Sequence, residues 1–597
     1  MKHIKKFIYL LSLNDQRGIG FLLIFLIISA FLDMAGIASI LPFMMVLSDP
    51  SLLETNFYLS FLHERSKLFG VKNQVDFLFI LGSSVFILLV ASLSFKAFVS
   101  YFQAQFIQNL GYSISKRLME RYLSQPYHWF LNRHSSDFGK IILSETDFII
   151  TSGFSKILDI IARGLIVIVI IILLLFVDTY LTFITFSLLG ISYFIIFFFV
   201  RKYLNKIGTK RLKNNQTRFA TVSEAFGAIK TIKVGSLEQA YINEFSIAAR
   251  IYAKTQASAS VISLLPRFFL EALAFGGILL VMLIFVSKNG SFVEILPIAS
   301  LYIFAGYRLL PSLQVIYSSI AQLTFVTPSL DKLYEDVKNI KKSNEERNNN
   351  ILTLNKSIRL NNICFKYPET QRLAIDNISL SIFSGSKVGF VGSTGSGKTT
   401  IIDIILGLLQ PQKGNLIIDK TIVSNQNFRS WQRSIGYVPQ QIYLSDNTIA
   451  SNIAFGLETK DINMGQVEKV SKIANLHEFV ISELPNKYLT TIGERGIRLS
   501  GGQLQRIGIA RALYHDPKVL IFDEATSALD NLTEKAVMDT INNLSEDITI
   551  ILIAHRIDTL KDCDNIFVME KGKLVSEGTF EELSKTNKMF SIYSNKK

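Results

Sequence analysis

Six long apolar stretches occupy the first 330 residues, and they constrain the fold more than any other feature of the sequence. A helix needs about 20 apolar residues to cross the hydrocarbon core of a bilayer. Because lipid offers no hydrogen bonds to the backbone, a long apolar segment crosses a membrane as a helix. We therefore predict six membrane helices, over residues 18–47, 75–102, 154–177, 179–200, 258–286 and 292–325.

The basic residues between these stretches predict the orientation of the chain. Lys and Arg number five in residues 106–150 and eleven in residues 201–256, against three in 48–74 and one in 287–291. Since cytoplasmic loops carry the excess of Lys and Arg, the two long loops are predicted to be cytoplasmic, and six crossings then place both termini there. No cleavable signal peptide is expected, because the first stretch is too long and lacks a small-residue cleavage site.

The overall charge fits this placement. The chain has 62 Lys and Arg against 48 Asp and Glu, a formal net charge of +14. Much of the excess lies in the predicted cytoplasmic loops, where it would face lipid headgroups, so we expect no nucleic-acid binding. The two cysteines, Cys364 and Cys563, have no CxxC motif or histidine cluster beside them, so neither a disulfide framework nor a zinc site is expected.

The two long loops are themselves predicted to be largely helical. Residues 113–124 and 211–232 show helical spacing of apolar side chains and would carry the membrane helices well into the cytosol. A short segment near residues 126–137 is predicted to cap the first loop, and one near residues 235–245 the second.

Composition changes abruptly after about residue 330, where the long Ile, Leu and Phe runs end. A polar stretch over residues 339–350 follows, and β-type runs alternate with helical segments from residue 351 onward, which predicts an α/β domain. The predicted domains are a six-helix membrane domain over residues 1–330, a linker over 331–350 and an α/β domain over 351–597.

A glycine-rich segment in the second half has the pattern of a phosphate-binding loop. An apolar strand over residues 387–391 precedes it and an apolar helix over 401–409 follows, which is the context that GxxxxGK[ST] requires. Glycines let backbone N–H groups turn towards phosphate oxygens, Lys398 would reach the β- and γ-phosphates, and Thr399 would ligate Mg²⁺. The predicted ATP-binding residues are Gly392, Ser393, Thr394, Gly395, Ser396, Gly397, Lys398, Thr399 and Thr400.

A second apolar strand, over residues 519–522, ends in two carboxylates, Asp523 and Glu524. Open α/β sheets bind ligands at the carboxyl ends of their strands, so these side chains are predicted to face the phosphates. Asp523 is expected to hold Mg²⁺. Glu524 is expected to act as the catalytic base that activates water.

The pentapeptide Leu499, Ser500, Gly501, Gly502 and Gln503 resembles the signature of ATP-binding-cassette (ABC) ATPases. The resemblance implies roles for four further residues. Tyr367 would stack on adenine, and Gln440 would contact Mg²⁺ and the catalytic water. His555 would be catalytic, and Asp530 would join the signature residues in the interface between two chains.

In the ABC family the signature caps the γ-phosphate bound by the other subunit, through a helix N-terminus that favours anions. This chain carries one complete set of motifs, so the resemblance implies a homodimer with two competent ATP sites. The segment that begins at Glu494 resembles the part of exporters that touches the membrane domain.

The whole chain resembles an ABC exporter half-transporter, which implies an all-α membrane domain with long cytoplasmic helical extensions, fused to an α/β P-loop ATPase domain. ATP binding and hydrolysis would drive alternating access of a central cavity. No peptidase segment precedes the first membrane helix, which disfavours a processing peptide exporter. An ATP-gated channel or regulatory subunit is also disfavoured, because Glu524 is intact.

Charged residues inside the predicted membrane helices are the main guide to the substrate. Arg267 and Glu271 are spaced for a mutual salt bridge, and Arg163 is near a helix end from which it can reach the membrane surface. Arg308 has no nearby partner in the sequence, so it is a candidate, with Arg267, for contacting an anionic headgroup in the cavity. The ionisable residues in these helices are Asp33, Lys96, Arg163, Arg267, Glu271 and Arg308.

Residues 33–43 and a short helix predicted over residues 56–67 resemble bacterial lipid-linked oligosaccharide flippases. Such proteins move a polyprenyl-diphosphate glycan outward across the bacterial inner membrane, and this is the substrate class that the resemblance implies. Lipid A flippases and multidrug exporters share the architecture and remain the alternatives.

Overall fold

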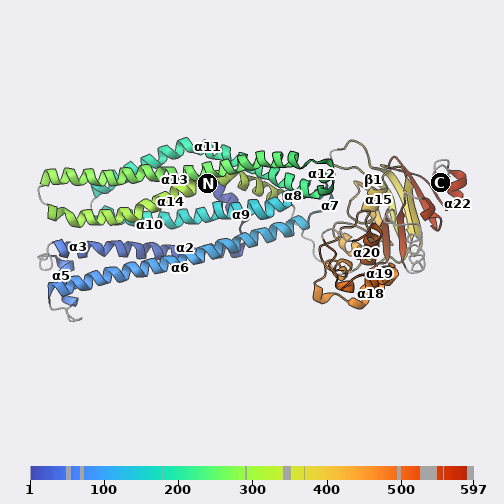
Figure 1. Cartoon of the computed structure of the whole chain (residues 1–597), viewed down its shortest axis with the longest axis horizontal. Coiled ribbons are helices and arrows are strands. Elements are labelled where there is room, and N and C mark those ends of the chain that lie inside the picture. The colour runs from blue at the N-terminus through green and yellow to red at the C-terminus, as the bar shows by residue number, and fades with distance from the viewer. Residues whose placement is uncertain are drawn as a thin grey trace. The chain divides into compact units, whose positions relative to one another are not determined.

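The computed structural model describes residues 2–48, 56–66, 73–177, 179–289, 292–340, 351–368, 370–493, 499–524, 548–554, 557–587 and 590. The chain forms two compact units (Figure 1). The first comprises Met1–Gln125 and Asn132–Lys342, and the second comprises Pro126–Leu131 and Ser343–Lys597.

The first unit is a bundle of long helices. Short π-helical turns, η2 (Lys140–Glu145) and η3 (Ile150–Phe154), interrupt the segment that leads into the third long helix. The α-helices are α1 (Lys2–Leu10), α2 (Leu13–Ala38), α3 (Ile40–Ser48), α5 (Phe57–Ser66), α6 (Gln74–Leu123), α8 (Ser135–Gly139), α9 (Thr146–Ile149), α10 (Ser155–Val177), α11 (Thr179–Gly227), α12 (Ile229–Gly235), α13 (Glu238–Asn289) and α14 (Phe292–Asn339).

Polar contacts fix the start of α2. The Ser12 hydroxyl accepts from the Asp15 backbone N–H at 3.2 Å, and the Ser12 N–H donates to the Asp15 carboxylate at 2.8 Å. This capping box satisfies backbone donors that a helix start leaves free. Arg117 of α6 donates to the Leu10 carbonyl at 2.6 Å, so the junction between α1 and α2 is tied to α6.

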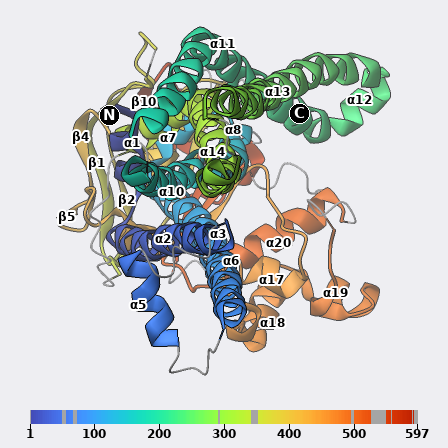
Figure 2. The same ribbon diagram turned by 90° about the vertical axis from the view of Figure 1, so that its left-hand side faces the viewer.

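Helix α10 lies between α2 and α14 (Figure 2). The apolar core at this junction includes Ala30 of α2, Ile170 of α10 and Ala305 of α14, which are at most 2% exposed. Alanines at the contact let neighbouring helix backbones approach closely, as is usual where helices pack in membranes.

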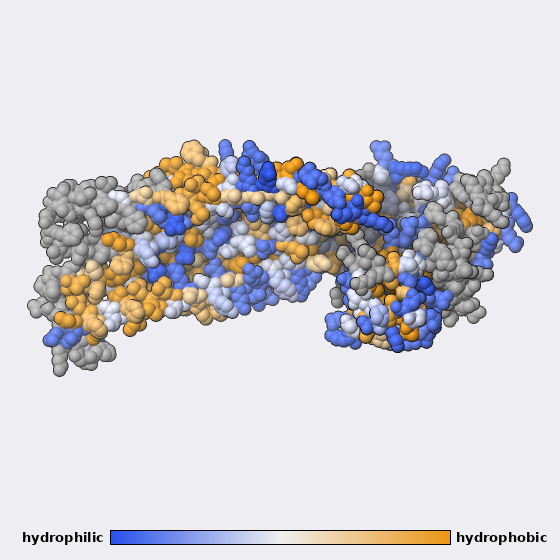
Figure 3. Space-filling view, viewed as in Figure 1, coloured by the Kyte–Doolittle hydropathy of each residue, from blue (hydrophilic) through white to orange (hydrophobic). Residues whose placement is uncertain are grey.

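Four stretches of the described residues are long and apolar enough to cross a membrane, namely Leu13–Leu47, Val75–Leu123, Ser135–Val177 and Leu301–Asn339. The other two predicted crossings fall within α11 and α13, where several side chains lie outside the described residues. Large apolar side chains such as Phe79, Phe176 and Phe199 are more than two-thirds exposed on the isolated chain. Figure 3 shows hydrophobic patches spread over the bundle face that it presents, as expected for a lipid-facing surface.

The extensions of the membrane helices, which the sequence predicts to be cytoplasmic, are helical, since α6 continues to Leu123 and α11 to Gly227. The short helix predicted over residues 56–67 is confirmed as α5. The segment that caps the second long loop lies at a different position from the predicted one near residues 235–245. It is α12, which ends before Ser236, a residue with φ of 52° in the left-handed region, so residues 238–245 already belong to α13.

Helix α14 also continues to Asn339, although the sequence predicts the linker to begin at residue 331. Leu330, Leu333 and Val337 are at most 5% exposed, so the apolar face of the helix stays covered along this extension.

The second unit contains two sheets. A four-stranded antiparallel sheet has the order β2-β1-β4-β5, and a six-stranded sheet has the order β10-β9-β3-β8-β7-β6. In the larger sheet β3 pairs in parallel with β8 and β9, β7 with β6 and β8, while β10 is antiparallel. The strands are β1 (Ser357–Phe365), β2 (Ile375–Phe383), β3 (Lys387–Gly392), β4 (Lys413–Ile418), β5 (Thr421–Ile422), β6 (Ile435–Val438), β7 (Val519–Asp523), β8 (Thr549–Ile553), β9 (Asn565–Glu570) and β10 (Lys573–Gly578).

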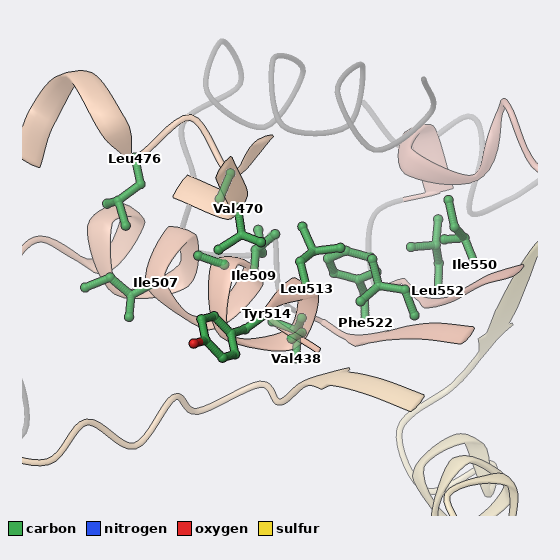
Figure 4. Packing of buried hydrophobic residues seen from close by; sticks show 14 of the residues in the cluster. Val438, Val470, Leu476, Ile507, Ile509, Leu513, Tyr514, Phe522, Ile550 and Leu552 are labelled. Atoms are coloured by element: carbon green, nitrogen blue, oxygen red, sulfur yellow. The ribbon is translucent and has the colours of Figure 1, made fainter. Parts of the chain in front are cut away.

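Helices cover these sheets and enclose the core. Ile507, Ile509 and Leu513 of one helix, α20 (Gly501–Leu513), pack with Phe522 of β7 and Val438 of β6, as Figure 4 shows. The phosphate loop therefore leaves the middle of the sheet, and the predicted carboxylates leave the strand two positions away. The helices of the second unit are α7 (Tyr127–Leu131), α15 (Lys398–Ile405), α16 (Phe428–Gln432), α17 (Ile449–Ile453), α18 (Met464–Ile473), α19 (His477–Glu483), α20 and α22 (Phe580–Thr586).

Candidate functional site

The glycine-rich segment forms a tight loop between β3 and α15. Gly395 and Gly397 have φ of 78° and 102°, a region that residues with a Cβ rarely adopt. A Cβ on Gly397 would also lie 2.8 Å from the Ala374 carbonyl oxygen. The loop conformation therefore requires glycine here, and it leaves backbone N–H groups at the start of α15, where an anion is favoured.

Lys398 folds back over this loop. Its Nζ donates to the carbonyl oxygens of Gly392 at 2.8 Å and Ser393 at 3.1 Å. Burial lowers the pKa of the Lys398 ammonium, and the negative charges of Glu524 and Asp523 oppose that shift. A phosphate oxygen would be a stronger acceptor than a carbonyl, so the ammonium is placed to move onto a phosphate.

The hydroxyls of the loop fit a nucleotide with its metal ion. The Ser396 Oγ is buried and has no hydrogen-bond partner among the described residues, which leaves it free to contact a phosphate oxygen. Thr399 is exposed at the start of α15, whereas the neighbouring Thr400 is buried. Thr399 is thus the threonine that is accessible to Mg²⁺, which prefers hard oxygen ligands.

Tyr367 lies beside this loop. Its hydroxyl is 3.1 Å from the Thr400 hydroxyl, and its ring meets Phe365 edge-to-face with centroids 5.0 Å apart. These two contacts hold a half-buried aromatic ring next to the phosphate loop. That position fits the adenine-stacking role that the family resemblance implies.

Asp523 and Glu524 follow β7, as predicted. The Tyr437 hydroxyl donates to the Asp523 carboxylate at 3.2 Å, and the Gln440 amide donates to the Glu524 carboxylate at 2.6 Å. Burial raises the pKa of Asp523, while the Tyr437 hydrogen bond lowers it. Glu524 has φ of 52°, which turns it away from the extended path of the strand. The structure therefore brings together the predicted metal ligand, base and loop glutamine.

The sequence reasoning missed two residues of this site, Tyr437 and Asp403. Burial and the charge of Asp523 raise the pKa of Asp403 to about 6. The signal in the sequence was a lone carboxylate in the apolar helix that follows the phosphate loop, five residues after Lys398. Among the described residues, no group of three or more His, Cys, Asp or Glu could hold a metal by itself, and Mg²⁺ in phosphate sites usually needs only one or two carboxylates.

The signature segment starts α20. Ser500 caps this helix, with its hydroxyl accepting from the Gln503 N–H at 3.2 Å and its own N–H donating to the Gln503 side chain at 2.8 Å. Gly501 and Gly502 form the first turn, and Leu499 packs against the core. The predicted residues Asp530, His555 and Glu494 lie outside the described residues.

The first unit contains a charged cluster around Asp33, whose side chain has no exposed surface. The carboxylate of Asp33 accepts from the Ser92 hydroxyl at 2.7 Å and from Lys96 Nζ at 3.1 Å. Arg308 approaches the same carboxylate at 4.0 Å. Arg308, without a nearby partner in the sequence, thus has a partner in space from a different helix.

A cavity of about 360 Å³ lies beside this cluster, between α2, α6 and α10. Lys96, Arg163, Gln103 and Asp159 are its main polar residues. Asp159 accepts from Gln103 at 2.9 Å and from Lys156 at 2.9 Å. Arg163, for which the sequence suggested a position near the membrane surface, instead lines this cavity.

Arg267 pairs with Glu271 of the same helix at 2.7 Å, which confirms the predicted salt bridge. Its side chain is 49% exposed on the isolated chain. The structure therefore separates the two arginines that the sequence grouped, because Arg308 belongs to the Asp33 cluster and Arg267 has its own acidic partner.

Two family models match the chain. The model for the ABC transporter transmembrane region matches residues 19–304, and a model described as ABC transporter matches residues 375–527. A bacterial Atm1-family ABC exporter with ATP bound has the same fold, with a TM-score of 0.77 and 22% identity over 95% of this chain and 96% of that one.

Curated relatives agree with these matches. A putative export ATP-binding/permease protein of Rickettsia bellii is 30% identical over 83% of this chain and 86% of its own length. An ATP-dependent lipid A-core flippase of Ralstonia nicotianae is 27% identical over 81% of each chain. The heterocyst differentiation ATP-binding protein HepA of Nostoc is 38% identical, but this chain spans only 47% of its length. The chain thus belongs to the ABC transporter family, membrane proteins in which an ATPase domain couples ATP hydrolysis to transport.

Proposed function

We propose that two copies of this chain form an exporter of the bacterial inner membrane that moves a phosphate-bearing amphiphile outward, specifically a polyprenyl-diphosphate-linked oligosaccharide. The observation that carries the substrate class is the excess of basic over acidic side chains around Asp33 and the neighbouring cavity. There, two carboxylates, Asp33 and Asp159, are accompanied by four cations, Lys96, Lys156, Arg163 and Arg308. Unpaired cations are strongly disfavoured within a membrane, so such an excess indicates an anionic ligand.

ATP hydrolysis would use the residues at the edge of the larger sheet. Lys398 and the loop N–H groups bind the phosphates, while Thr399, Asp523 and Gln440 are the residues that would hold Mg²⁺, which neutralises phosphate charge when bound. Glu524 would accept a proton from the attacking water, and its contact with Gln440 holds the carboxylate at the site. His555 and Asp530 stay assigned by family resemblance alone.

The signature segment supports the proposal of a homodimer. Ser500 and the two glycines form a helix N-terminus, which favours an anion. The phosphate loop of the same chain already supplies its own helix N-terminus, at α15. A second copy related by two-fold symmetry would bring its signature to the open side of the nucleotide, as the family resemblance implies.

We also propose coupling between the two units, as the family resemblance implies. Helix α7 belongs to the compact ATPase unit, although α6 before it and α8 after it belong to the membrane unit. We propose that α7 and α12 transmit the movement of the ATPase domains to the long helices, so that ATP binding opens the cavity outward and hydrolysis resets it.

Among the possible anionic amphiphiles, we choose the polyprenyl-diphosphate oligosaccharide because residues 33–43 resemble lipid-linked oligosaccharide flippases. The relatives named lipid A-core flippase also favour a phosphate-bearing lipid. Lipid A remains the alternative, and a multidrug substrate is the alternative outside the anionic class.

Stimulation of ATPase activity tests the proposal. The full-length protein in nanodiscs is titrated with a polyprenyl-diphosphate oligosaccharide, with lipid A and with a lipophilic cation. We expect the first lipid to stimulate hydrolysis, and we expect Arg163→Ala and Arg308→Ala to need about 10-fold or more lipid, since a charge-assisted phosphate contact contributes about 1.5–3 kcal/mol.

Lys116→Ala provides the matched control, because Lys116 is an exposed cation further along α6 that pairs only with Glu120 among the described residues. Stimulation by lipid A alone would favour the first alternative. Stimulation by the cation alone, unchanged in the arginine variants, would contradict an anionic substrate.

A further inference from the structure

Asp33 is the acidic centre of the charged cluster in the membrane unit. Its fully buried carboxylate joins three helices, because it accepts from Ser92 and Lys96 of α6 and lies 4.0 Å from Arg308 of α14. Lys96 is 24% exposed and also lines the cavity, so it faces both Asp33 and the cavity. The same ammonium can therefore reach the resident carboxylate or a ligand.

The cluster contains more positive than negative charge. Arg163 lines the cavity with Lys96, and within the described part of the chain it forms no hydrogen bond or ion pair. Its charge and that of Arg308 both act on Lys96. The cavity is also lined by Asp159, which pairs with Lys156 at 2.9 Å. Four cations, Lys96, Lys156, Arg163 and Arg308, thus accompany two carboxylates, and an excess of two positive charges lies beside a cavity of about 360 Å³.

A buried charge is strongly disfavoured unless it is paired. Lys96 and Arg308 therefore need the carboxylate of Asp33 as a partner when no anion is bound in the cavity. A bound phosphate would be a competing partner, because it needs the same N–H donors of Lys96 and Arg308. It would also repel the carboxylate of Asp33 at this short range.

We propose that Asp33 is the resident counter-ion of the substrate site, one that yields Lys96 and Arg308 to the phosphate when the substrate binds and takes them back when it leaves. This inference rests on the proposed function, since it requires an anionic substrate. Asp33 is a positioning residue that weakens binding and speeds release. Its carboxylate compensates part of this positive charge between transport cycles.

The first test is Asp33→Asn, which keeps the shape of the side chain and an oxygen that can accept from Ser92 but removes the charge. Binding of a polyprenyl diphosphate to the full-length protein in nanodiscs is measured by native mass spectrometry, with the uncharged polyprenol as the reference lipid. We expect the Kd for the diphosphate to fall on the order of 10-fold, with no change for the polyprenol. Translocation at saturating lipid should slow, because release is slower.

Ser92→Ala is the matched control. It removes the other hydrogen bond to the same carboxylate without changing any charge. If Asp33 acted only through local structure, Ser92→Ala and Asp33→Asn would shift Kd in the same way for both lipids. We expect Ser92→Ala to leave the ratio of the two Kd values as in the wild type.

A second pair of variants covers the case in which Asp33→Asn does not fold because two cations lose their partner. Lys96→Gln and the double variant Asp33→Asn, Lys96→Gln differ only in the Asp33 charge, and the double variant has the net charge of the wild type. We expect the double variant to bind the diphosphate more tightly than Lys96→Gln by a similar factor.

Equal affinity within this second pair, or unchanged affinity in Asp33→Asn, would overturn the role of Asp33. The proposed function fails separately, if Arg163→Ala and Arg308→Ala bind the diphosphate as well as the wild type does. If the arginine variants bind the diphosphate more weakly but the Asp33 variants do not bind it more tightly, the counter-ion role of Asp33 is rejected and the proposed function is retained.

Discussion

At the scale of single residues, the chemistry of the ATP site is concentrated at the ends of two strands. Glu524 lies with φ of 52° after β7, and Gln440 contacts its carboxylate at 2.6 Å. Sequence motifs predicted both residues. The motifs did not predict that Tyr437 and Asp403 also surround Asp523. Tyr437 belongs to the run that ends in Gln440, but that run assigns no role to the tyrosine, and Asp403 belongs to no recognisable pattern.

We expect Glu524→Gln to bind ATP but to lose most turnover. The amide has the shape of the carboxylate yet accepts no proton from water, and loss of a general base typically lowers the rate by about 10²–10⁴-fold. Steady-state phosphate release and binding of a fluorescent ATP analogue measure the two properties. Hydrolysis at the wild-type rate would remove Glu524 from this role.

Asp403 gives a prediction for pH. Its pKa is raised from 3.8 to about 6 in the folded protein, so the folded state favours the neutral acid. The corresponding stabilisation is complete below about pH 4 and is lost as the pH rises through 6. Asp403→Asn should therefore have a higher Tm than the wild type at pH 7.5, and the difference should shrink as the pH falls from 6.5 to 5. Thermal unfolding in nucleotide-free buffer measures this, and a difference independent of pH would contradict it.

At the scale of elements, periodicity predicted most helices, but their ends depended on local geometry. The helix after the phosphate loop ends at Ile405 rather than at residue 409, because Gly407 adopts φ of 68° just beyond it. Similarly, left-handed Ser236 ends α12 and shifts the second cap towards the N-terminus. Gly407 is a residue type that commonly ends helices, but it lies inside the apolar run over residues 401–409, whereas Ser236 gives no stop signal in the sequence.

A buried ion pair connects the helical extensions of the membrane helices. Arg211 of α11 is 1% exposed, donates to Glu145 of η2 and to Ser329 of α14, and lies 3.6 Å from the ring centroid of Phe148. Asn215 donates to the other oxygen of Glu145 at 2.7 Å. Sequence alone did not reveal this pairing, because the partners lie far apart along the chain.

We expect Arg211→Met to lower the free energy of unfolding by about 3–5 kcal/mol, since it leaves the Glu145 charge buried without its cation. Adding Glu145→Gln should recover part of that loss. Lys213→Met, at an exposed position on the same helix, is the control and should change stability by about 0.5 kcal/mol or less. Denaturation in detergent measures all three, and a loss in Arg211→Met no larger than the control would show that the pair contributes little.

At the scale of the whole molecule, the sequence predicted an apolar helical half and an α/β ATPase half, and the family and fold matches confirm this architecture. The pattern of charge in the membrane half was harder to interpret. The pair of Arg267 and Glu271 follows from helical spacing. By contrast, Asp33 meets Lys96 and Arg308 only through packing of three helices, which no local pattern encodes.

The proposed dimer predicts a complementation pattern. Ser500→Arg should abolish hydrolysis in the homodimer, because the bulky cation would block the helix start that faces the partner's nucleotide. Mixing it with a Lys398→Ala chain should restore at most one of the two composite sites, which phosphate release from mixed dimers of defined composition measures. Normal hydrolysis by a purified Ser500→Arg dimer would contradict the trans arrangement.

The central claim is that ATP drives a phosphate-bearing lipid outward across the membrane. The most direct measurement is translocation of a labelled polyprenyl-diphosphate oligosaccharide in proteoliposomes that contain the full-length protein. We predict transport that requires ATP, is lost in Glu524→Gln and falls about 10-fold or more in Arg308→Ala, where a charge-assisted contact is removed. Transport of this lipid at equal rates in the wild type, in Arg308→Ala and in the Arg163→Ala, Arg308→Ala double variant would contradict the account.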